Sequence, residues 1–232
     1  MYLYLIVILL AIAVPFALSF EKNLMLYKRW KFLFPAILIT MVFFIIWDII
    51  FTHIGCWVFN PKYISGIYIF KLPLEEYLFF IAIPYTCVFT YYAIKFHFPK
   101  FKVSIKGASI LSIVIIIISL IVAFTNIHRL YTFVNFLVLA LILFVTYFYK
   151  REVLQFYFAI FPVLLVPFFI VNGILTGTGI DQEVFKYNQT VITGIYIFSV
   201  PIEDAFYAFS LLLSVIMLTE VLETRYVKKE TK

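Results

Sequence analysis

Seven long apolar stretches limit what this chain can fold into. Each is long enough, at about 1.5 Å per residue in a helix, to cross about 30 Å of bilayer hydrocarbon. With 65% hydrophobic and 13% charged residues, the chain carries more apolar surface than a water-soluble protein of 232 residues buries. A water-soluble enzyme is therefore excluded. The sequence predicts an all-α integral membrane protein with seven transmembrane helices over residues 2–20, 31–52, 73–94, 108–127, 130–149, 153–175 and 199–219.

The Lys and Arg residues between these stretches predict the orientation of the chain. Four of the 18 would lie on one side of the membrane, and they are Lys62, Lys71, Arg129 and Lys186. The other fourteen would lie on the opposite side. Because Lys and Arg concentrate in cytoplasmic loops, we expect a cell-membrane protein with its N-terminus outside and its C-terminus in the cytoplasm. No Lys or Arg precedes the first stretch, so we interpret it as a span and not as a cleaved signal.

Residues 59–76 recur 128 positions later, as residues 187–204. Nine of the eighteen aligned positions are identical, including an uninterrupted Gly-Ile-Tyr-Ile-Phe, and both copies end in a Pro-x-Glu-Glu/Asp motif. An odd number of helices between the copies gives both the same orientation, as in parallel-repeat membrane proteins. We therefore predict a 3+1+3 architecture: a first three-helix repeat over 1–98, a linker helix over 99–129 and a second three-helix repeat over 130–232.

Five acidic side chains fall within the predicted spans, where each costs about 2.5 to 3.5 kcal/mol. They are Asp48, Glu75, Glu76, Glu203 and Asp204. Proline followed by carboxylates is also ordinary chemistry for a helix N-terminus, but two such motifs at matched depth favour a functional role. Asp48 lies close to the outer end of its span, and the first motif begins the next span from the same side. The three carboxylates of the first half therefore share a layer, where neighbouring acids can share a proton.

Four motifs carry a resemblance to a known family. They are Trp47-Asp48, residues 55–61 (GCWVFNP), residues 72–80 (LPLEEYLFF) and residues 201–204 (PIED). Through them the chain resembles the integral-membrane lycopene cyclase domain family, in which two related halves are separate subunits or one fused polypeptide. The resemblance covers nearly the whole chain as a fused two-repeat form. The second motif departs from the pattern, because Asp204 replaces the second Glu and Ala205-Phe206 replaces the Tyr-Leu pair.

The resemblance implies an enzyme that closes the ψ-ends of lycopene or a related linear carotenoid into ionone rings. A proton adds to the terminal double bond, the tertiary carbocation is attacked intramolecularly, and another proton leaves. This intramolecular lyase or isomerase chemistry requires a carboxylic acid, a carboxylate acceptor and aromatic faces near the cation. The acids would be the five carboxylates above, and we expect Glu75 and Glu76 to be more sensitive to substitution than Glu203 and Asp204, because Asp48 adds a third carboxylate in the first half. The substrate-binding aromatics would be Trp47, Trp57, Tyr68, Tyr77, Phe79, Phe80 and Tyr196.

Other classes of protein fit the residues less well. The last span lacks the lysine that a retinal Schiff base needs, and no Asp-x-x-Asp motif or Cys/His spacing predicts a metal. No glycine fingerprint predicts a cofactor, and the dispersed basic residues do not predict a nucleic-acid partner. The serious alternative is a small-solute transporter, because 3+1+3 parallel repeats also build such carriers. Membrane lipid is the expected surrounding, and the sequence is compatible with a homo-oligomer as well as a monomer.

Overall fold

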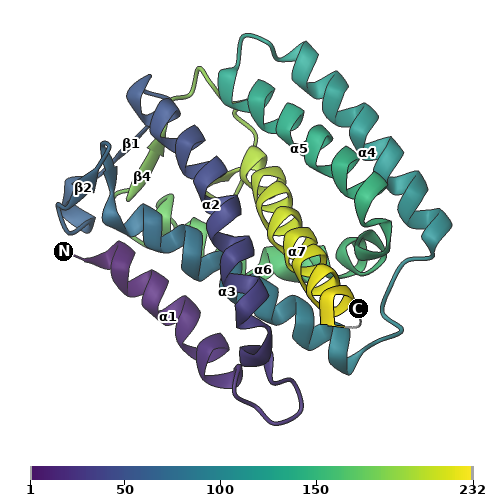
Figure 1. The fold of residues 1–232 in the computed structure, drawn as a ribbon. Helices are drawn as coiled ribbons and strands as arrows, with labels where there is room; N and C mark the ends of the chain where they lie inside the picture. Colours follow the sequence, from purple (N-terminus) through teal and green to yellow (C-terminus); the bar gives the residue numbers. More distant parts are fainter. Residues whose placement is uncertain (1, 231–232) are drawn as a thin grey trace.

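The computed structural model describes residues 2–230, and the final two residues of the predicted second repeat lie outside that range. Within it the chain forms seven α-helices in the order expected from the apolar stretches (Figure 1). They are α1 (Leu3–Leu18), α2 (Trp30–His53), α3 (Leu74–His97), α4 (Ile105–Thr125), α5 (Leu130–Tyr149), α6 (Arg151–Leu175) and α7 (Ile202–Glu230). The all-α membrane fold predicted from the sequence is confirmed.

Six of the seven helices are long and apolar enough to cross a membrane. The exception is α1, which has 16 residues and would measure about 24 Å, less than the hydrocarbon thickness of about 30 Å. The predicted span over 199–219 begins too early. Val200–Pro201 forms a short strand, so that α7 starts only at Ile202.

Short strands and the 3-10 turn η2 (Pro61–Tyr63) connect the helices at the end of the molecule where α3 and α7 begin, whereas the 3-10 turn η1 (Leu26–Arg29) lies between α1 and α2 at the other end. The hairpins β2–β3 (Tyr68–Ile69 and Leu72–Pro73) and β5–β6 (Tyr196–Ile197 and Val200–Pro201) precede α3 and α7. Strands β1 (Trp57–Phe59) and β4 (Phe185–Tyr187) pair antiparallel with each other.

The two copies of the sequence repeat adopt matching local structures. Helix α3 packs against α1 as α7 packs against α5, and α2 packs against α7 as α6 packs against α3. The antiparallel β1–β4 pair is centred on Val58 and Lys186, which are themselves 128 positions apart. Helix α4 packs mainly on α5 and also contacts α6. The domain boundaries between residues 98 and 99 and between 129 and 130 stay predictions.

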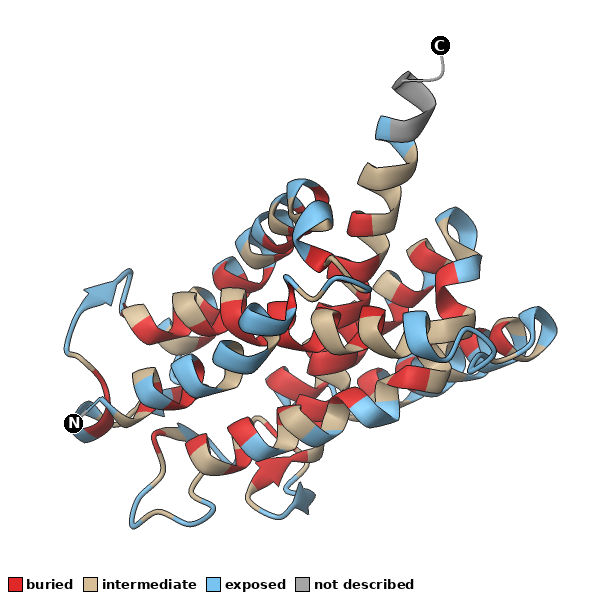
Figure 2. Ribbon diagram, turned by 90° about the horizontal axis from the view of Figure 1, so that it is seen from below, coloured by how far each residue is buried: buried red, intermediate tan, exposed pale blue. Residues whose placement is uncertain are grey.

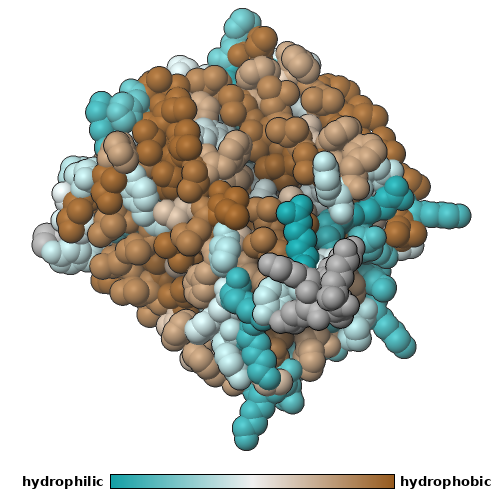
Figure 3. Space-filling model, in the orientation of Figure 1, coloured by the Kyte–Doolittle hydropathy of each residue, from teal (hydrophilic) through white to brown (hydrophobic). Residues whose placement is uncertain are grey.

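Buried residues gather where the helices face one another, and exposed apolar residues cover the outside (Figures 2 and 3). In Figure 3 a hydrophobic band lies between hydrophilic residues near strands β1, β2 and β4 and those where α7 ends. At the α7 end, Arg29 and Lys95 pair with Glu220, Arg29 also pairs with Glu223, and Lys150 donates to Thr224. Basic residues from the start of α2 and the ends of α3 and α5 therefore meet at one end of the bundle.

Candidate active site

The two hairpins place both Pro-x-Glu motifs in the same way. Gly66 and Gly194 have φ values of 83° and 78°, a left-handed conformation that favours glycine and accounts for its recurrence. The first carboxylate of each motif turns back to the loop ahead of its own hairpin. Glu75 Oε1 accepts the Ser65 amide at 2.6 Å, and Glu203 Oε1 accepts the Thr193 amide at 2.7 Å. Both side chains thereby hold a loop in place.

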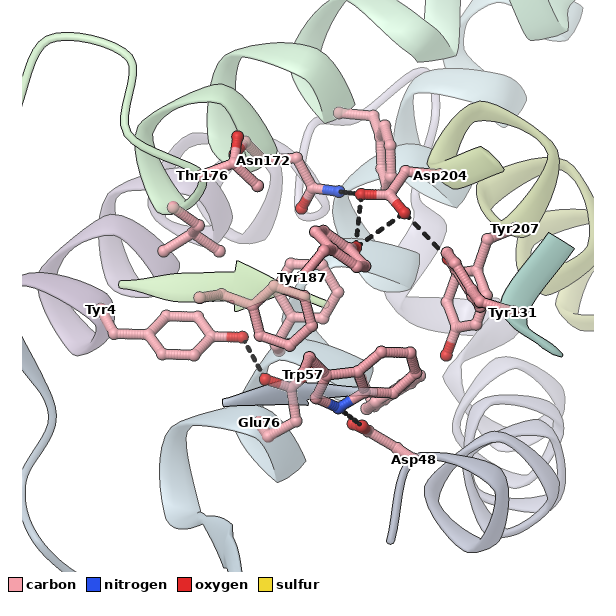
Figure 4. A pocket seen from close by; sticks show the side chains of 15 residues that line it. Tyr4, Asp48, Trp57, Glu76, Tyr131, Asn172, Thr176, Tyr187, Asp204 and Tyr207 are labelled. Carbon is pink, nitrogen blue, oxygen red and sulfur yellow. Dashed lines mark hydrogen bonds between the residues drawn. The ribbon is translucent and has the colours of Figure 1, made fainter. Parts of the chain in front are cut away.

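The second carboxylate of each motif, Glu76 or Asp204, instead lines an internal cavity (Figure 4). The hydroxyl of Tyr4 on α1 donates to Glu76 Oε2 at 2.6 Å. The side chain of Glu76 also interacts directly with Asp48 of α2. The indole of Trp57 on β1 donates to Asp48 Oδ1 at 2.8 Å. The first half thus supplies two contacting carboxyl groups, both of them buried.

Asp204 has more hydrogen-bond donors than Glu76. The hydroxyls of Tyr131 and Tyr187 donate to its carboxylate at 2.8 and 2.7 Å, and the Asn172 amide does so at 3.4 Å. In Figure 4, Asp204 lies on one side of the cavity and Glu76 and Asp48 on the other, with Tyr187 and Trp57 between them. Acidic groups from both copies of the repeat therefore meet at one site.

Aromatic rings form most of the remaining wall of this cavity. Its volume is about 60 Å³. That is smaller than the roughly 150 Å³ that holds a benzene molecule in an engineered protein cavity, so a ring-forming substrate would have to displace side chains. The lining consists of three carboxyl groups, Asn172, Leu175, Thr176 and the aromatic residues Tyr4, Trp57, Phe79, Phe80, Tyr131, Phe168, Phe185, Tyr187 and Tyr207.

The structure separates the residues predicted from the sequence into two groups. Six line the cavity: Asp48, Trp57, Glu76, Phe79, Phe80 and Asp204. The others lie outside its lining. Trp47 packs behind the wall, with its ring centroid 5.1 Å from that of Tyr207. Tyr68 and Tyr196 are exposed on the hairpins, and the hydroxyl of Tyr77 donates to the Ile69 carbonyl. Glu75 and Glu203 bond to the hairpin loops, as described above.

Four tyrosines of the cavity were not among the predicted site residues. Tyr4, Tyr131 and Tyr187 hold the carboxyl groups, and Tyr207 lines the cavity one turn after Asp204. Two of these tyrosines, Tyr4 and Tyr131, occupy equivalent positions in the two halves of the sequence. Leu3-Tyr4 matches Leu130-Tyr131 at an offset of 127, so extending the self-comparison to the first helix of each half would have found them.

The fold and this site define a class of protein: a multi-pass membrane protein with an acidic, aromatic-walled cavity inside its helix bundle. A family model described as lycopene cyclase matches residues 1–94 and 128–222, and the unmatched stretch between them contains α4. The chain belongs to the lycopene cyclase family, which makes it an enzyme that acts on a carotenoid. Comparisons with curated proteins and with solved structures find no match.

Proposed function

We propose that this protein closes the ψ-ends of lycopene, or of a related linear carotenoid, by acid catalysis at one composite site. The observation that supports this most is the meeting of Asp48, Glu76 and Asp204 in one aromatic-walled cavity. Family membership favours this enzyme over a small-solute transporter. The reaction is an isomerisation, because one proton enters the substrate and one leaves.

The pair formed by Glu76 and Asp48 is suited to donate the proton. Two buried carboxylates in contact repel each other, so the pair is favoured with one shared proton. The pair can pass this proton to the terminal double bond of a substrate that enters the cavity, which forms a tertiary carbocation. The neighbouring double bond then attacks the cation and closes a six-membered ring.

Asp204 is suited to accept the proton that the cyclic cation loses. Hydrogen bonds from Tyr131, Tyr187 and Asn172 favour its charged form. The developing cation would lie among the rings of Trp57, Tyr131 and Tyr207, where each cation–π contact contributes about 0.5 to 2 kcal/mol. Loss of a ring proton to Asp204 restores a neutral alkene, and the donor pair must be reprotonated before the next turnover.

Expression in a host that accumulates lycopene tests the reaction directly. We expect lycopene to decrease and monocyclic or bicyclic products to appear on chromatographic separation of the pigments. The control is the same host carrying the double variant Glu76→Gln/Asp204→Asn, which lacks both proposed proton-transfer groups. An unchanged pigment profile in cells with verified expression of the parent chain would contradict the proposed function.

We further propose that the basic end of the bundle, where Arg29, Lys95 and Lys150 meet, faces the cytoplasm of a cell membrane. A reporter active only in the cytoplasm should then give signal when fused after Lys232, and it should remain silent when inserted at Asn60 or Gln182. The physical reason is the 14-to-4 distribution of Lys and Arg. Signal from the loop insertions and silence at the C-terminus would reverse the orientation and place the acidic cavity near the cytoplasmic side.

A further inference from the structure

An apolar groove runs between α2 and α5 on the lipid-facing surface, behind the wall of the acidic cavity. Its volume is about 390 Å³. From Phe43 to Ile54, the residue directly after α2, it extends over twelve residues, which is about 16 Å along the helix axis. The groove therefore extends from the end of α2 near β1 toward the middle of the membrane. Its two sides are formed mainly by Phe43, Ile46 and Ile50 of α2 with the adjoining Ile54, and by Val134 and Val138 of α5.

Trp47 and Phe51 form the back of this groove and separate it from the cavity. The Trp47 ring centroid lies 5.1 Å from that of Tyr207 and 6.2 Å from that of Tyr131. The Phe51 ring lies 5.3 Å from that of Trp57. Both side chains thus contact rings of the cavity on one side and line the lipid-facing groove on the other.

No hydrogen bond from its N–H to the described residues 2–230 fixes the orientation of the Trp47 indole. It is buried, and its N–H has no hydrogen-bond partner within the part of the chain that the structure describes. Indole N–H groups in buried positions usually have a partner. The cavity, at about 60 Å³, has no room for a carotenoid end-group as it stands, so side chains of its wall must move when an end-group enters.

We propose that the α2–α5 groove binds the polyene chain of the carotenoid while its end-group reaches the carboxyl groups past Trp47. This inference rests on the proposed function. A long hydrocarbon with one end in the cavity must leave its remaining length in an apolar place, and the groove is apolar and parallel to the helices. Trp47 is then a positioning residue, because it shapes the passage and takes no part in proton transfer.

A second apolar groove, on α6, provides a matched control. It is lined by Leu165, Val166, Phe169, Ile170 and Phe198, among others, and its volume is about 620 Å³. This groove also adjoins the cavity, because Phe169 lines the groove and its ring packs against that of Phe168, which lines the cavity. If the polyene chain lies on α6 instead, obstruction of this second groove should impair the enzyme.

The test is to fill each groove with a tryptophan and to measure initial rates in phosphatidylcholine vesicles that contain lycopene. We expect Val138→Trp to raise the KM for lycopene about tenfold with kcat within about threefold, because the proton-transfer groups are untouched. Val134→Trp, one turn away in the same groove, should do the same and serves if the first variant does not accumulate. The control Val166→Trp should leave KM within about twofold of the parent value.

Unchanged KM values in the α5 variants would overturn the proposal, and so would an equal or larger rise in Val166→Trp. An equal or larger rise in Val166→Trp would indicate that the polyene chain of the carotenoid binds in the groove on α6. Absence of any cyclic product from the parent chain is a different outcome, since it would contradict the proposed function itself. If the parent cyclises lycopene and the α5 variants keep the KM of the parent, only the proposed binding of the polyene chain in the α2–α5 groove is refuted.

Discussion

The variant Glu76→Gln should lose at least about a hundredfold in lycopene cyclisation per enzyme molecule, because positioned acids and bases contribute about 10² to 10⁴ to a rate. Glutamine keeps the size and polarity of the side chain but cannot donate a proton at neutral pH. It can still accept the hydrogen bond from Tyr4, so the local structure should survive. The measurement is product formed per purified protein, with membrane abundance determined in parallel.

The neighbouring variant Glu75→Gln is the matched control for this experiment. Glu75 lies outside the cavity lining, and its bond to the Ser65 amide can be kept by the amide oxygen of glutamine. We expect turnover within about threefold of the parent, with any loss appearing in abundance, since an altered buried hydrogen bond acts on stability. Full activity of Glu76→Gln, or a larger loss of turnover in Glu75→Gln, would contradict the assignment of Glu76 as part of the proton donor.

In the second half, Asp204→Asn should also lose at least about a hundredfold in turnover. Asparagine keeps the shape of the side chain but removes the charge that the proton acceptor needs. It also places an amide group where Tyr131, Tyr187 and Asn172 all donate, so those donors cannot all keep their acceptor. The expected readout is loss of cyclic product with lycopene still bound, measured by co-purification of the pigment.

Glu203→Gln controls for the second motif in the same way. Glu203 Oε1 accepts both Thr132 Oγ1 and the Thr193 amide, and an amide oxygen at this position can keep those contacts. Its turnover should stay near that of the parent. If Asp204→Asn were active and Glu76→Gln inactive, the first half alone would hold the catalytic groups. That result would contradict the proposed composite site.

Much of this architecture was predictable because the signals are local. An apolar stretch of about twenty residues has few alternatives to a membrane helix, and six of the helices meet that criterion. The repeat at an offset of 128 placed two acidic motifs at the same depth. The position of Asp48 near the outer end of its span indicated a common layer, and the structure brings Asp48 into direct contact with Glu76.

The sequence by itself therefore determined the order of the helices and the presence of two related acidic motifs, each at the start of an equivalent helix. Only the tertiary structure decided which acid of each pair lines the cavity. Consecutive residues of an α-helix point about 100° apart, so Glu75 and Glu76 face different directions. The sequence alone does not tell which of the two faces the cavity, because this depends on where the neighbouring helices lie. The contributions of Tyr4, Tyr131 and Tyr187 follow from packing between distant segments. No local pattern encodes such contacts, because they depend on how the two halves meet.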